Sequence, residues 1–287
     1  MKLGFSLLSL FMKDVNEMLD IAVENGFDSV ELLAEGPYRP DEMLGNKEMT
    51  EVFHSYDLDI YMHAVNVDIN LASLNPGIRK ESVKQTKDCL DLADEIGAIG
   101  ITAHPGKIGR PEKYLRDMAL EFLTESTHEL VAYAEDKEAK ISIENMPERF
   151  SYLGNRAYEL ENLTNETGCN ITIDLGHVNT CEDQESFFKI PNILYNHIND
   201  NDGIKDKHQA IGDGTLDLNL LKHVKHGIIE LNNFDNVMKS IEIINHQKGL
   251  NIGARHISIS TSGLVPKIYD LADKVKHQNI TIMKLLD

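Results

Sequence analysis

Histidines and carboxylates are concentrated in the segment 196–213, which reads NHINDNDGIKDKHQAIGD. His197 closes a short apolar run, several aspartates follow it, and Asp206 and His208 stand two positions apart. Neutral imidazole nitrogens and carboxylate oxygens are common ligands of divalent metals. A metal site is therefore one interpretation of this segment, and a solvated acidic loop after a strand is the other.

The same residue types follow the earlier apolar runs of the chain. The candidates are His63 in IYMHA, His104 in ITAHPG, Glu144 in ISIENMP, Asp174 and His177 in ITIDLGH, His197 in ILYNHIND with Asp206 and His208 after it, and Glu230 in GIIELN. Taken alone, a histidine near a strand usually packs, and a carboxylate often caps the following helix. Buried carboxylates, however, are costly without a compensating cation. The joint pattern therefore indicates a metal centre with nine ligands.

The elements that must position these side chains form a regular alternation. Short apolar runs alternate with amphipathic segments, as in α/β folds with a parallel sheet. The predicted strands are Leu3–Leu8, Ser29–Leu33, Ile60–His63, Ile99–Ala103, Lys140–Ile143, Ile171–Ile173, Leu194–Ile198 and Gly227–Leu231. The predicted helices include Val15–Asn25, Ile78–Ile96, Pro111–Lys137 and Asn236–His246. Gly26 and Gly97 are stop signals, and Pro111 is placed in a first helical turn.

Eight strands alternating with helices predict an α/β fold, a (β/α)8 TIM barrel, whose usual length is roughly 250 residues. The carboxyl ends of barrel strands share one face, where active sites of this fold lie, so all nine candidates would meet there. A doubly wound sheet is the alternative, because periodicity does not show closure. We expect residues 1–248 to form the barrel and residues 249–287 a C-terminal extension.

The number of candidate ligands exceeds what one ion needs. Four or five ligands complete a zinc or manganese shell when water or substrate takes the open position. Nine ligands, some of them bridging, therefore predict two or three ions, with Zn²⁺ preferred and Mn²⁺ as the alternative. Clustered divalent ions suit phosphoester hydrolysis, because they activate water and stabilise the attacking and leaving oxygens. Sugar isomerisation needs fewer ligands and gives no role to His63, His104, Asp206 or His208.

Composition limits the classes of partner. The 287-residue chain has a formal charge of −19, which argues against a broad non-specific grip on nucleic acid. No apolar run reaches the roughly 18 residues of a membrane span, and MKLGFSLLSLFMKDV is interpreted as a strand start, not a signal peptide. Cys89, Cys169 and Cys181 show no close pairing, which favours a cytoplasmic protein.

At these residues the chain resembles the xylose isomerase-like TIM-barrel superfamily, and within it AP endonuclease family 2, typified by endonuclease IV. The resemblance covers roughly Met1–His246 and is carried by HAVNVDINLAS, HPG, IEN, IDLGH, HINDNDG, DKHQAIGDG and the strand-eight glutamate. It implies a trinuclear zinc site formed by His63, His104, Glu144, Asp174, His177, His197, Asp206, His208 and Glu230. It also implies that Glu144 bridges ions at the activated water, and that abasic DNA is a candidate substrate.

The motifs also resemble a broader group described as sugar phosphate isomerases/epimerases. In that alternative, which uses two ions, Glu144 and Glu230 are metal-bridged acid/base groups that act on a small sugar or sugar phosphate. Two departures from endonuclease IV weaken the DNA-repair interpretation. The loop Ala64–Val67 lacks the aromatic residue that wedges into DNA, and basic candidates such as Lys107 and Lys205 are few.

Two acidic residues of the opening segment, Asp200 and Asp202, have no place in the ligand set. They either shape their loop or face the substrate. The glycines of GDGTLD (212–217) are interpreted as a turn into a helix and not as a phosphate-binding loop.

The C-terminal segment NIGARHISISTSGLVPKIYDLADK resembles part of the radical-SAM 23S rRNA adenine methyltransferases, over residues 231–275. That family requires a CxxxCxxC cluster motif, which this chain lacks, so we expect no methyltransferase activity. A βαβ-like fragment is predicted, with strand Ile252–Ser260, helix Leu264–Lys276 and strand Asn279–Leu285.

Overall fold

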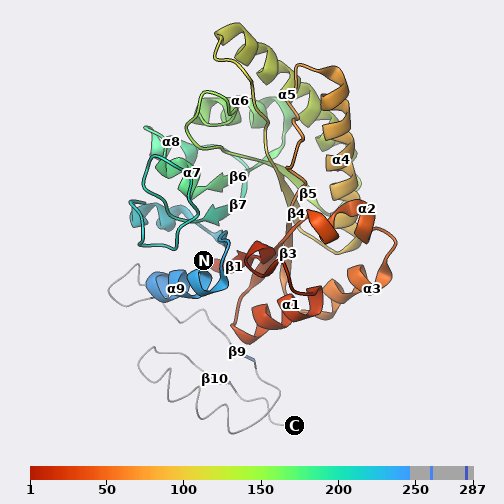
Figure 1. The fold of residues 1–287 in the computed structure, drawn as a ribbon, viewed down its shortest axis with the longest axis vertical. Coiled ribbons are helices and arrows are strands. Elements are labelled where there is room, and N and C mark those ends of the chain that lie inside the picture. The colour runs from red at the N-terminus through yellow and green to blue at the C-terminus, as the bar shows by residue number, and fades with distance from the viewer. Residues whose placement is uncertain (246–258, 261–281, 284–287) are drawn as a thin grey trace.

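Eight parallel strands close into a barrel in the computed structural model, which describes residues 1–245, 259–260 and 282–283 (Figure 1). The strands are β1 (Lys2–Ser6), β2 (Ser29–Leu33), β3 (Asp59–His63), β4 (Gly100–Ala103), β5 (Lys140–Glu144), β6 (Asn170–Asp174), β7 (Ile193–Ile198) and β8 (His226–Ile229). Each strand pairs with the next, and β8 pairs with β1 through the register Lys2↔His226 to Phe5↔Ile229. This closure confirms the TIM barrel and excludes the doubly wound sheet.

Helices cover the outside of the barrel (Figure 1). The α-helices are α1 (Val15–Glu24), α2 (Pro40–Met43), α3 (Lys47–Thr50), α4 (Pro76–Glu95), α5 (Lys113–Tyr133), α6 (Ala157–Thr167), α7 (Leu175–Asn179), α8 (Gln184–Phe187) and α9 (Phe234–Asn245). Short 3-10 helices are η1 (Leu7–Leu10), η2 (Gly36–Tyr38), η3 (Glu51–Ser55) and η4 (Leu218–His223). The helices bury one apolar face against the strands; α1, for example, buries Met18, Leu19 and Ala22.

Several predicted boundaries were wrong by a few residues. The helix expected from Pro111 begins at Lys113, because Glu112 is its N-cap and has an extended backbone. The proline in a first turn is instead Pro76 of α4, where the Asn75 side chain accepts hydrogen bonds from the Gly77 and Ile78 amides. The stop signals were correct: Gly26 and Gly97 have φ angles of 72° and 71°, which glycine adopts without strain.

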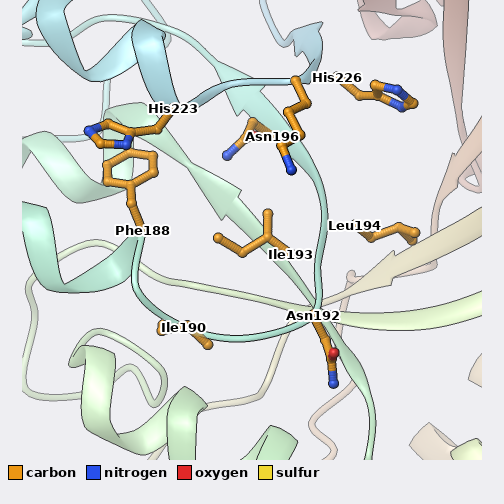
Figure 2. A pocket seen from close by; sticks show the side chains of 9 residues that line it. Phe188, Ile190, Asn192, Ile193, Leu194, Asn196, His223 and His226 are labelled. Atoms are coloured by element: carbon orange, nitrogen blue, oxygen red, sulfur yellow. The ribbon is translucent and has the colours of Figure 1, made fainter.

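One side of the barrel lacks a full covering helix. Between β7 and β8 the chain forms only loops and η4. A cavity of about 520 Å³ opens at the amino-terminal ends of these two strands, and Figure 2 shows Phe188 and His223 stacked at its edge. It lies at the end of the barrel opposite to the predicted ligands.

The remaining sequence predictions have these outcomes. All three cysteines are free and buried. Among the described residues, no helix is long and apolar enough to cross a membrane. In the C-terminal segment, β9 (Ile259–Ser260) pairs in parallel with β10 (Ile282–Met283). The predicted helix Leu264–Lys276 and the rest of both predicted strands lie outside the described residues.

Candidate metal centre

All nine candidate ligands lie at the carboxyl end of the barrel. His63, Glu144 and Asp174 are the last residues of β3, β5 and β6, and His197 is the next-to-last residue of β7. The other five follow their strands directly or in the attached loops. The side chains form three groups whose ligand atoms lie within 4.8 Å of one another: His63, His104 and Glu144; Glu144, Asp174, His197 and Glu230; and His177, Asp206 and His208.

Glu144 belongs to two of these groups. Its Oε2 lies 3.1 Å from His104 Nε2 and 3.6 Å from His63 Nε2. Its Oε1 lies 2.8 Å from His197 Nδ1. The two oxygens of one carboxylate therefore face different groups, which is the arrangement of a bridging ligand.

The group of Glu144, Asp174, His197 and Glu230 is called the central group, and its acidic residues lie around His197. Its Nδ1 lies 3.3 Å from Glu230 Oε2 and 4.0 Å from Asp174 Oδ2. Asp174 also caps α7, since its Oδ1 accepts a hydrogen bond from the His177 amide, as the sequence suggested for a strand-end carboxylate. Its Oδ2 accepts a hydrogen bond from Asn199 Nδ2 at 2.7 Å, so the capping role leaves the carboxylate within the group.

The third group combines His177 of α7 with Asp206 and His208 of the long loop after β7. Asp206 Oδ2 lies 3.2 Å from His177 Nε2 and 3.1 Å from His208 Nε2. His208 adopts a φ of 45°, a left-handed conformation that is uncommon for a residue other than glycine. Such strain persists only where the surrounding structure fixes it, and it is typical of functional sites.

Three imidazoles are oriented by backbone carbonyls. The Nδ1 atoms of His63, His177 and His208 lie 2.9, 2.7 and 3.0 Å from the carbonyl oxygens of Ala64, Asn145 and Glu230. Since a carbonyl only accepts, each Nδ1 carries a proton, so that in the neutral imidazole each Nε2 presents its lone pair to the cluster. Metal-binding histidines are commonly held by this kind of hydrogen bond.

The electrostatics of the cluster favour positive charge within it. Burial lowers the pKa of His63 and His177, but the carboxylates around them raise it to about 9 and about 10. Burial likewise raises the pKa of Glu144, yet His197, His104 and His63 hold it well below its usual value. For Glu230, burial dominates and the pKa is raised. His104 is an exception, because burial lowers its pKa despite the nearby Glu144. Around the other histidines, the field that stabilises imidazolium would also stabilise a divalent cation.

Two buried oxygen atoms test whether cations fit this set. Glu144 Oε2 and Asp206 Oδ1 are buried without a hydrogen-bond partner. Unpaired buried carboxylate oxygens are costly unless a cation or an ordered water compensates them. Both belong to the groups described above, and nitrogen and oxygen donors of this type suit zinc or manganese. The residues present therefore fit a multinuclear centre.

The two unassigned aspartates shape the loop that carries Asp206 and His208. Asp200 is buried, and its carboxylate accepts hydrogen bonds from the amides of Asn201, Gly212, Gly214 and Leu216. Gly214 is required there, because a Cβ atom would lie 2.1 Å from the Asn201 carbonyl oxygen. Asp202 Oδ1 accepts from the amides of Ile204 and Lys205. Loop formation, not substrate contact, explains both residues.

The sequence analysis missed Glu31 on β2. Its side chain is fully buried, and its Oε1 lies 2.8 Å from His197 Nε2 and 2.6 Å from the Tyr195 hydroxyl. A charged residue inside the otherwise apolar strand SVELL was the available signal. Glu31 lies in the middle of β2, whereas the nine candidates lie at or after the carboxyl ends of their strands.

Comparison with known proteins gives a consistent result. Residues 19–259 match the family described as xylose isomerase-like TIM barrel. An uncharacterized protein of Methanocaldococcus jannaschii is 31% identical over 264 residues, 85% of this chain and 88% of that protein.

Solved structures divide between two activities. A D-tagatose 3-epimerase-like protein matches with a TM-score of 0.77 and 29% identity, over 88% of this chain and 98% of that one. Endonuclease IV from Thermus thermophilus matches with a TM-score of 0.66 and 19% identity, over 84% and 98% of the two chains. IOLI protein with a bound zinc atom also shares the fold, with a TM-score of 0.67 and 17% identity over 84% of this chain and 93% of that one.

The methyltransferase resemblance is confirmed as a short fragment. A probable dual-specificity RNA methyltransferase of Bacillus velezensis is 58% identical over 50 residues, which are 17% of this chain and 14% of that enzyme.

Proposed function

This chain belongs to the xylose isomerase-like TIM barrel family, and we propose that it is a divalent-metal-dependent phosphoester hydrolase of endonuclease IV type. One observation carries the proposal: nine ligands form three groups, two of which share the carboxylate of Glu144. An isomerase with one or two ions would use at most two of these groups. It would leave at least one of them without a role.

Two or three Zn²⁺ ions, or Mn²⁺ as the alternative, are the proposed cofactors. His63 and His104 would hold one ion with Glu144, the central group a second, and His177, Asp206 and His208 a third. Bound divalent ions supply a lowered water pKa and compensation for the charge that develops on phosphoester oxygens.

The chain's own residues prepare this chemistry. Glu144 is the proposed bridging catalytic carboxylate, with one oxygen toward His104 and the other toward His197. Glu230 approaches the same His197 nitrogen from β8 and is proposed as the second catalytic carboxylate. The fixed imidazole tautomers leave ligand lone pairs directed inward, so that little reorganisation accompanies the reaction.

The second candidate is a sugar or sugar-phosphate isomerase/epimerase. The D-tagatose 3-epimerase-like neighbour favours it, as does the loop Ala64–Val67, whose exposed residue Val67 is aliphatic and not aromatic. In this reaction Glu144 and Glu230 would exchange protons with carbons beside the sugar carbonyl.

Metal content separates the two candidates. Elemental analysis after zinc reconstitution should give close to three ions per chain for the hydrolase and one or two for the isomerase/epimerase. Cleavage of a duplex with an abasic site, and of a sugar phosphate ester, then identifies the substrate, with ketose epimerisation assayed in parallel. A chain that binds no metal, or one whose hydrolase activity survives Asp206→Ala unchanged, would contradict the proposed trinuclear centre.

A further inference from the structure

Glu31 lies directly beneath the central ligand group but belongs to none of the three groups. Its carboxylate is fully buried, and Oε1 contacts both His197 Nε2 and the Tyr195 hydroxyl. It comes from β2, a strand that supplies no candidate ligand. Its direct contact with the cluster is through His197, and its charge also acts at longer range on His63.

A buried polar layer holds Glu31 and Tyr195 in this arrangement. The Tyr195 hydroxyl also contacts Thr102 Oγ1, which lies 2.6 Å from Thr172 Oγ1 and 3.2 Å from Ser142 Oγ. These side chains are all buried inside the barrel. Because Tyr195 donates its proton to Glu31, the position of Oε1 is fixed by a rigid network and not by His197 alone.

The hydrogen bond to Glu31 determines which His197 nitrogen faces the cluster. An ionised carboxylate only accepts, so Nε2 keeps a proton toward Glu31, and Nδ1 is the nitrogen that faces Glu144 and Glu230. A cation bound in the cluster would replace the proton on Nδ1 and leave the proton on Nε2 in place. His63, His177 and His208 show the reverse arrangement, in which Nδ1 donates its proton to a backbone carbonyl. His197 is thus set apart from these three by a carboxylate partner.

Hydrogen bonding alone does not explain why this partner is charged. The amide oxygen of a glutamine would accept the same two protons at much lower desolvation cost. Glu31 Oε2 is in addition buried without a hydrogen-bond partner. A negative charge in this position becomes favourable when positive charge lies on the far side of the imidazole. The carboxylate then makes the other imidazole nitrogen, which faces the cluster, a stronger metal ligand.

We infer that Glu31 is a positioning residue that sets the affinity of the central metal position through His197, with a much smaller effect on the two outer positions. The inference rests on the proposed metal centre, and it makes a selective claim within it. A residue that only supported the fold would weaken all three positions together.

The experiment compares Glu31→Gln, Glu31→Ala and the control Glu159→Gln. Glu159 is a buried carboxylate of α6 that pairs with Arg116 and contacts no candidate ligand. Each protein is equilibrated with buffered free zinc and analysed for ions per chain, and the visible absorption of its cobalt-substituted form is recorded. Thermal unfolding is measured in parallel.

In Glu31→Ala, the affinity of one ion out of three should fall by about 10- to 100-fold, the usual effect of losing an outer partner of a metal-binding histidine. Glu31→Gln keeps the acceptor and should lose less affinity, but its cobalt absorption should shift. Glu159→Gln should retain wild-type metal affinity and cobalt absorption even if it unfolds at a lower temperature.

Unchanged zinc affinity and cobalt absorption in both Glu31 variants would overturn the inference. Equal weakening of all bound ions in Glu31→Gln would also overturn it, since that pattern indicates a general structural role. A wild-type chain that binds no ion would instead refute the proposed function, and this inference with it.

Discussion

The two ends of the barrel carry similar residue types and differ in what those residues can do. At the carboxyl end, five histidines and four carboxylates form the three ligand groups. At the amino end, His223 and His226 line the cavity of Figure 2 together with Lys225. There His226 Nδ1 lies 3.0 Å from the Tyr61 hydroxyl, and burial lowers the pKa of His226.

The difference lies in the carboxylates. Each histidine at the carboxyl end has at least one acidic oxygen within 4.0 Å and shares a group with other candidate ligands. At the amino end, His223 has a single carboxylate, Glu185, at 3.5 Å, and His226 contacts a phenol. No ligand group was found at the amino end within the part of the chain that the structure describes. A cavity, several histidines and one carboxylate therefore do not give a candidate ligand group; converging carboxylates do.

The largest effect in this comparison should come from Glu144→Gln. The amide removes the shared charge from two groups, so two ions should be lost. Hydrolase activity should fall by more than the roughly 100-fold expected when a metal-binding histidine loses its hydrogen-bond partner. Elemental analysis and the phosphoester assay measure both. Retention of all ions would show that Glu144 does not bridge.

A smaller loss should follow His63→Ala, with His226→Ala as its matched control at the other end. His63→Ala should bind one ion fewer, because His104 and Glu144 alone make an incomplete site. His226→Ala should retain the full wild-type metal content. If the two variants show the same metal content, the distinction between the barrel ends is wrong.

Asp200→Ala should act on stability first. The variant loses the acceptor of four backbone amides, and hydrogen bonds to charged groups are strong, so the free energy of unfolding should fall by roughly 3 kcal/mol or more. The ion held by His177, Asp206 and His208 should also bind more weakly. Asp202→Ala, at an exposed turn of the same loop, should have a much smaller effect in denaturant titrations.

The smallest and most gradual effect should be that of pH. Against the opposing effect of burial, carboxylates raise the pKa of His63 to about 9 and of His177 to about 10, from 6.5. Their contribution to metal-free stability is therefore complete below pH 6.5 and declines as pH rises through 9 and 10. Zinc binding requires neutral histidine and strengthens over the same range. The difference in melting temperature with and without zinc should widen from pH 6 to pH 9; a constant difference would contradict this.

Strand periodicity and residue type were sufficient to predict the barrel and to select the nine candidate ligands. His63 and Glu144 could be selected because parallel strands align their carboxyl ends, so that their last residues converge wherever the sheet closes. The starts of helices were less predictable: the extended N-cap residue of α4 is Asn75, directly before Pro76, whereas that of α5 is Glu112, directly after Pro111.

The grouping of the ligands was decided by tertiary structure. Glu144 reaches His104 and His197 with different oxygens, and Glu31 reaches His197 from 166 positions away in the chain. Such partners depend on the register of the barrel strands, which long-range pairing sets. They also depend on side-chain direction, which alternates along each strand. The sequence by itself therefore determined the fold and which residue types converge at its carboxyl end. Only the folded barrel decided which atoms face one another, because hydrogen bonds and charges act over a few ångströms of space and not over distance along the chain.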